Sequence, residues 1–187
     1  MRFDFYDLKG AFATLAEVLS LKGLEFTPLE STSYLHPGRA ALISQAGHAI
    51  GRVGQLHPRI ASSYKFKQPV FVAELDFGAM LSCERAEARY RPLPKFPQVQ
   101  RDVALLIETS VQLAALQSAI FALQIPELSN VRLFDLYAGK ELPAGKHSLA
   151  LTLSYRAADR TLTDEEVNAA HERVVQTLRN QFGAEIR

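Results

Sequence analysis

The sequence has 187 residues, of which 48% are hydrophobic and 22% charged, as in ordinary globular proteins, and its formal net charge is +1. This length fits one large domain or two small ones. Residues 1–91 carry 11 Lys and Arg against 9 Asp and Glu, and residues 92–187 carry 10 against 11. Neither half is basic enough for a protein that binds nucleic acid mainly by neutralising phosphates.

The sequence predicts a protein of the reducing cytoplasm. It contains no run of roughly 18 apolar residues that would span a membrane, and its first seven residues, MRFDFYD, do not resemble a signal peptide. Cys83 is the only cysteine, which excludes an intramolecular disulfide. It could act as a nucleophile, but Glu84 and Arg85 follow it and no His stands nearby, so we expect an inert thiol.

The first half predicts an antiparallel sheet with one flanking helix. Asp7 can cap a helix that ends at Gly23 and whose apolar face carries Phe12, Leu15, Ala16 and Leu19. Strands are expected at residues 24–27, 41–44, 48–54 and 70–76, with a hairpin turn at Ala46-Gly47.

Residues 89–97 form a proline-rich segment that predicts an extended linker. Proline occupies positions 92, 94 and 97, which excludes a helix and a central strand there. We therefore expect a first domain at residues 1–88 and a second at residues 98–187.

The second half predicts a βαββαβ order, the ferredoxin-like arrangement, so the whole chain belongs to the α+β class. Strands are expected at residues 103–107, 131–137, 147–156 and 184–187. Thr109 with Gln112, and Thr163 with Glu166, have the spacing of helix capping boxes. This fold places two helices on one face of a four-stranded sheet and leaves the other face open.

Alternation of side chains along the strands predicts which residues lie on the open face. Leu149, Leu151, Leu153 and Tyr155 should face the helices, as should Val103, Leu105 and Ile107 of the first strand and Phe134 and Leu136 of the second. The open face should then carry Asp135, Tyr137, Ser148 and the small Ala104.

These four residues have the chemistry to hold an unstacked nucleobase. A tyrosine ring is a stacking platform, a carboxylate accepts hydrogen bonds from base N–H groups, and a hydroxyl donates or accepts. Single-stranded loops of RNA are recognised in this way. In the alternative interpretation, Tyr137 only covers the end of a strand and Asp135 pairs with Lys140 or Lys146.

Several segments together resemble one family. In the second half they are FP at 96–97, RDVA at 101–104, LFDLY at 133–137, KHSLA at 146–150 and RTLTD at 160–164. These resemble the ferredoxin-fold anticodon-binding domain of the bacterial phenylalanyl-tRNA synthetase beta subunit. In the first half, DFYDLKG at 4–10, HPGRA at 36–40 and GRVGQLHP at 51–58 resemble the end of that subunit's catalytic-like domain, which has a class II synthetase-like fold.

The resemblance implies a role in an (αβ)2 enzyme that joins phenylalanine to its tRNA with ATP and Mg²⁺. Its alpha subunit carries out catalysis, so this chain, with its partners the alpha subunit and a second beta subunit, is expected to be non-catalytic and to hold no cofactor. The family's contacts to the first anticodon base of tRNA(Phe), a guanine, correspond here to Tyr137 for stacking, Asp135 and Ser148 for hydrogen bonds, and the Ala104 position. The beta subunit is several times longer than this chain, so we expect a C-terminal piece or a short paralogue.

Other basic residues and histidines give weaker evidence of a functional site. Arg39 and Arg52 are the basic residues near the predicted hairpin, and no glycine-rich strand ending in Arg resembles an ATP-binding motif. The spacings of His36, His48 and His57 match no compact zinc pattern, and His171 is expected at the boundary of the last helix's apolar stripe.

Two alternative functions remain, because fold alone does not decide function. One is a ferredoxin-like module that binds a protein or an amino acid, and the other is an independent enzyme.

Overall fold

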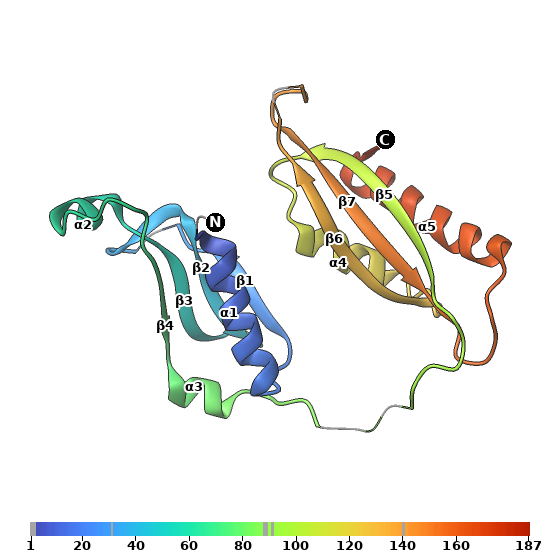
Figure 1. Ribbon diagram of the computed structural model, residues 1–187, viewed down its shortest axis with the longest axis horizontal. Helices are drawn as coiled ribbons and strands as arrows, with labels where there is room; N and C mark the ends of the chain where they lie inside the picture. Colours follow the sequence, from blue (N-terminus) through green and yellow to red (C-terminus); the bar gives the residue numbers. More distant parts are fainter. Residues whose placement is uncertain (1–2, 31, 88–89, 91, 140) are drawn as a thin grey trace. The chain divides into compact units, whose positions relative to one another are not determined.

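The computed structural model describes residues 3–30, 32–87, 90, 92–139 and 141–187. The chain forms two compact units, residues 1–90 and residues 91–187 (Figure 1). Of the predicted linker, residues 89 and 91 lie outside the described residues, and so does residue 88 at the predicted end of the first domain. No helix in the described part of the chain is long and apolar enough to cross a membrane.

The first unit is an antiparallel sheet of four strands in the order β1-β2-β3-β4, with α1 and α3 contacting its central and edge strands. Its elements, in chain order, are α1 (Phe5–Val18), β1 (Leu24–Pro28), β2 (Leu35–Gln45), β3 (His48–Leu56), α2 (Pro58–Ser63), β4 (Phe71–Leu75) and α3 (Phe77–Ser82).

The predicted hairpin is confirmed, because β2 and β3 pair across Ala46 and Gly47. Both turn residues have positive φ, 48° and 80°, as a two-residue type I′ turn requires. The predicted first cap is wrong. Asp4 caps α1 by accepting from the N–H groups of Tyr6 and Asp7, while Asp7 supplies the returning half of the capping box.

The core of the first unit lies between this sheet and its helices. Phe12 and Ala16 of α1 meet Ile43 and Val53 of the sheet, and Met80 of α3 completes the cluster. Leu15, expected on this apolar face, is 40% exposed. The buried residues of α1 are Phe12 and Ala16, four positions apart, so the buried face of this helix is narrower than the sequence predicts.

The second unit has the ferredoxin-like fold, as expected. Its elements are β5 (Val99–Glu108), α4 (Leu113–Ala122), β6 (Leu128–Tyr137), β7 (Lys146–Tyr155), α5 (Asp164–Phe182) and β8 (Glu185–Ile186). The strands are antiparallel in the order β6-β7-β5-β8, and both helices cover the same face of the sheet (Figure 1).

The central strands β5 and β7 supply most of the second core. Leu149, Leu151, Leu153 and Tyr155 are at most 2% exposed, which confirms the predicted helix-facing side of β7. Val174 and Leu178 of α5 pack against these strands within one buried cluster. Fully burying side chains of this size contributes about 1.5–3 kcal/mol each, so the sheet has one strongly preferred orientation toward the helices.

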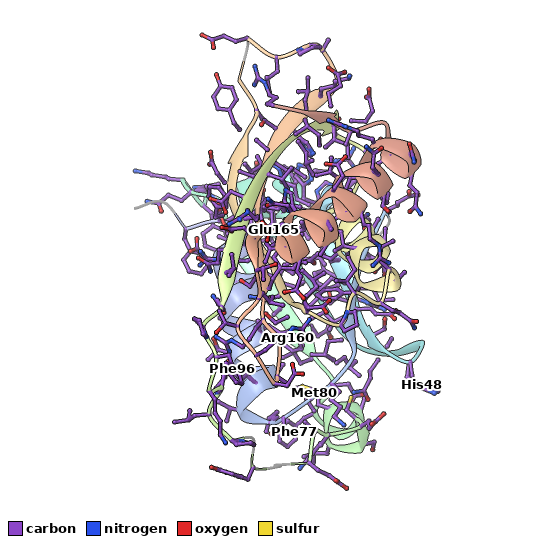
Figure 2. All side chains as sticks on the ribbon, turned by 90° about the vertical axis from the view of Figure 1, so that its right-hand side faces the viewer. His48, Phe77, Met80, Phe96, Arg160 and Glu165 are labelled. Atoms are coloured by element: carbon purple, nitrogen blue, oxygen red, sulfur yellow. The ribbon has the colours of Figure 1, made fainter. Side chains whose placement is uncertain are left out.

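Of the two predicted capping boxes, one forms. Thr163 and Glu166 exchange hydrogen bonds at the start of α5. Arg160, which lies in the loop before α5 (Figure 2), pairs with Glu166 at 2.6 Å. The predicted capping box of Thr109 and Gln112 does not form, because α4 begins about one turn later and Gln112 is itself the N-cap residue. The Gln112 side chain makes no capping hydrogen bond.

Candidate nucleic-acid interface

The face of the second sheet that the helices leave uncovered brings together all four predicted site residues. Tyr137 of β6 pairs with Ser148 of β7, and one step along the sheet Asp135 pairs with Ala150. Ala150 pairs on its other side with Ala104 of β5. Directly paired residues point to the same side of a sheet, so these side chains share the open face.

The strand β6 is irregular in the middle of this site. Leu133 pairs with Leu151 and Asp135 pairs with Ala150, so Phe134 is an extra residue in a β-bulge. Phe134 is 50% exposed, so it is not in the core as alternation predicts. Leu136 is on the helix side by its pairing with Leu149, but it is 51% exposed, so it too is not a core residue.

The Tyr137 ring and two alanines lie on the open face. Tyr137 is 45% exposed, and its hydroxyl end lies against Gly139, where a Cβ atom would be only 2.0 Å from the Tyr137 Oη. Ala104 and Ala150 are paired neighbours whose side chains are single methyl groups, so the sheet has little bulk at that point. A flat aromatic ligand could therefore lie across the alanines within reach of Asp135.

The charges nearby leave Asp135 available to a ligand. Lys146, one of its two suggested partners, instead pairs with Glu185 at 2.5 Å, and this hydrogen bond is the main cause that raises the Lys146 pKa. Lys140, the other suggested partner, lies outside the described residues. Within the part of the chain that the structure describes, Asp135 has no ion-pair partner.

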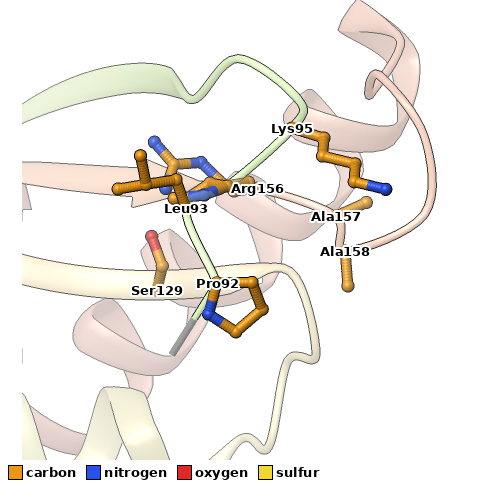
Figure 3. Close-up of a pocket in the computed structure, with 8 residues that line it drawn as sticks. Pro92, Leu93, Lys95, Ser129, Arg156, Ala157 and Ala158 are labelled. Carbon is orange, nitrogen blue, oxygen red and sulfur yellow. The ribbon is translucent and has the colours of Figure 1, made fainter. Parts of the chain in front are cut away.

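A second hollow lies beside the segment that precedes β5, and the sequence reasoning did not identify it. This cavity of about 400 Å³ is lined by Pro92, Leu93, Ser129 and Arg156, among others (Figure 3). Arg156 follows β7 at the end opposite Ser148, and its guanidinium donates to Gln98 at 3.3 Å. The proline-rich composition of this segment was the only sequence signal for it.

The basic residues of the first unit take part in local contacts. Arg39 donates to Gln55 at 2.9 Å, and Arg52 lines a surface cavity of about 390 Å³ with Glu74 and Asp76. Tyr34 donates a hydrogen bond to Glu74, and this bond is the main cause that raises the Tyr34 pKa.

His57 and His171 each make a local contact within their own unit. His57 caps α2 by accepting from the Arg59 N–H at 3.1 Å, which fits a His-Pro pair at the start of a helix. His171 lies half-buried beside Tyr155, with their polar atoms 3.3 Å apart. Among the described residues, no group of three His, Cys, Asp or Glu could hold a metal ion.

Comparisons with known proteins match each unit to a domain family. The family described as "Ferredoxin-fold anticodon binding domain" matches residues 94–187, and "Phenylalanyl tRNA synthetase beta chain CLM domain" matches residues 1–77.

Curated relatives with the name phenylalanine–tRNA ligase beta subunit match along almost the whole chain. The protein of Geobacillus kaustophilus is 44% identical over 185 residues, which are 98% of this chain and 23% of the relative. That of Symbiobacterium thermophilum is 41% identical over 98% of this chain and 20% of the relative. That of Syntrophotalea carbinolica is 34% identical over the full chain and 23% of the relative. The chain thus spans about a quarter of these relatives' length, and it belongs to the family of proteins with a ferredoxin-fold anticodon binding domain.

Proposed function

We propose that the open face of the second unit binds the anticodon of tRNA(Phe), and that the chain acts as the C-terminal part of a phenylalanine–tRNA ligase beta subunit. The observation that carries this proposal is the juxtaposition of Tyr137 with Ser148 and of Asp135 with the two alanines on one uncovered sheet face. The family match over residues 94–187 supports the same assignment.

Each side chain has a distinct role in this proposal. The Tyr137 ring stacks on the first anticodon base, a guanine, while the Asp135 carboxylate accepts from its N–H groups. The Ser148 hydroxyl makes a further hydrogen bond, and Ala104 leaves room for the base to lie flat. None of these groups forms or breaks a covalent bond, so their work is recognition.

The names of the relatives support a role in a larger assembly. We propose that the chain works in the cytoplasm within an (αβ)2 enzyme, beside an alpha subunit and a second beta subunit. In that enzyme the alpha subunit joins phenylalanine to tRNA, using ATP and Mg²⁺. The first unit, which matches the CLM domain over residues 1–77, contributes a non-catalytic, class II synthetase-like part of that assembly.

The direct test is a titration of the 187-residue chain with the tRNA(Phe) anticodon stem-loop and, separately, with free phenylalanine. The stem-loop should bind, and Tyr137→Ala should weaken binding by about 1–3 kcal/mol because a stacking partner is lost. Tyr6→Ala is a matched control, since Tyr6 is an exposed tyrosine (72%) of the first unit.

The alternatives give different results in the same titration. Binding of phenylalanine without binding of RNA would favour an amino-acid-binding module and reject the proposal. Equal losses for Tyr137→Ala and Tyr6→Ala would show that the ring on the open face has no specific role.

A further inference from the structure

We infer that Phe134 is a second stacking platform, which holds a base next to the one at Tyr137 in the anticodon loop. This inference rests on the proposed function and adds a nucleotide to it. Its origin is the bulge in β6, which the sequence pattern does not predict.

The bulge moves Phe134 from the core to the open face. Leu133, before it, pairs with the fully buried Leu151, so Leu133 faces the helices. Asp135, after it, pairs with Ala150 on the open face. Two residues of β6 thus oppose one residue of β7, and both Phe134 and Asp135 point away from the helices.

The surroundings of Phe134 leave its ring free for a ligand. Half of the residue is exposed, and no other aromatic ring of the described residues contacts it. Three positions separate it from Tyr137, which corresponds to roughly 7–10 Å along the strand. Bases stacked on each other are only about 3.4 Å apart, which is less than the distance between the two rings. The two rings would therefore bind neighbouring bases that are unstacked from each other and lie on the sheet.

A cation lies next to this platform on the same face. Arg132 pairs with Thr152 across the sheet, two positions before Phe134, and it is exposed. It has no ion pair with any residue that the structure describes. An aromatic ring beside a free guanidinium is the combination that binds a base and its phosphate in single-stranded RNA.

The strand geometry disfavours a protein partner added at this edge. β6 is the edge strand of the sheet, and its ladder is interrupted twice, at Ser129 and at Phe134. Bulges of this kind protect an edge from pairing with another strand. The strand around Phe134 also carries charge, because Arg132 and Asp135 are both exposed, whereas the centre of a protein interface is depleted in charge.

The experiment measures stem-loop binding by the 187-residue chain with Phe134→Ala, Phe134→Leu and Phe134→Tyr. Three RNAs are compared: the intact stem-loop and two loops that each lack the base on one side of the first anticodon position. Phe134→Ala and Phe134→Leu should weaken binding of the intact loop roughly tenfold, and Phe134→Tyr should retain it, because stacking needs the ring. With one of the two abasic loops, the effect of Phe134→Ala should shrink to less than about twofold.

Phe121→Ala is the matched control, since Phe121 is 49% exposed on α4, on the covered side of the sheet. Thermal melts of each variant exclude unfolding as the cause of weaker binding. If Tyr137→Ala weakens binding but the Phe134 variants do not, the second platform is rejected and the proposed function stands. A constant tenfold loss with all three RNAs also rejects it, and failure of the unsubstituted chain to bind RNA rejects both.

Discussion

At the scale of single residues, the contact between the buried Tyr155 and the half-buried His171 links the stability of the second unit to pH. Burial raises the pKa of Tyr155 to about 12. Burial is also the main cause that lowers the pKa of His171, and the positive charge of Arg101 lowers it further, against a smaller opposite effect of Glu172. The neutral imidazole is therefore the form that the folded state prefers.

The sign of the pH effect follows from proton binding. Because the His171 pKa is lower in the folded chain than the unfolded value near 6.5, the unfolded chain binds the proton first as the pH falls. The free energy of unfolding should thus decrease as the pH falls below about 6.5, and it should level off below the folded-state pKa. Urea denaturation of the chain at a series of pH values checks this, with His171→Phe as the comparison; an unchanged pH dependence in the variant would exclude His171 as its source.

At the scale of elements, the connection after β6 positions the Tyr137 ring. The ring's hydroxyl end occupies the space where a Cβ of residue 139 would lie, at 2.0 Å from the Oη and 2.2 Å from the Cζ. Gly139→Ala should therefore displace the ring while the fold stays intact, because the displaced atoms are at the end of an exposed side chain. Stem-loop binding should weaken, though by less than with Tyr137→Ala.

Gly10→Ala is the control for this substitution, since Gly10 lies on α1 with open space around its Cα. Fluorescence anisotropy and a thermal melt of both variants are sufficient. Unchanged RNA affinity of a folded Gly139→Ala chain would mean that the packing of the ring on Gly139 does not matter for binding.

The elements also show which parts of the fold a sequence pattern can predict. The leucines of β7 are buried against the helices as the alternation predicts, but Thr152 (8% exposed) and Ser154 (4%) on the opposite side are buried as well, so exposure alternates only in the first half of the strand. β6 has the same type of sequence, but its bulge shifts the alternation, and no turn residue or glycine signals that shift. Phe134 was therefore wrongly expected in the core. Leu136 does lie on the helix side, as expected, but it is 51% exposed, and the outward direction of Asp135 and Tyr137 was correct.

Two short helices were missed for a related reason. α2 and α3 have six residues each, which is too short for an apolar period to develop. The sequence features that indicate these two helices are confined to their first turns. Pro58 stands at the first helical position after His57, and the Asp76 side chain accepts from the Ala79 N–H at 2.9 Å.

At the scale of the whole molecule, a net charge of +1 indicates that phosphate neutralisation contributes little to RNA binding. On the open face, Lys146 is already paired with Glu185, while Arg132 has no ion pair among the described residues. Under the proposed function, RNA binding by this chain therefore depends on stacking and hydrogen bonds to a few bases.

The most direct measurement is the affinity of the chain for two stem-loops, one with guanine and one with no base at the first anticodon position, each measured with Tyr137 and with Tyr137→Ala. The original chain should bind the guanine loop roughly tenfold more tightly than the abasic loop, and Tyr137→Ala should bind both about equally, because ring and base act as one stacking pair. Equal affinity of the original chain for the two loops, or the same preference for guanine in both proteins, would contradict the assignment of the open face as the site of the anticodon base.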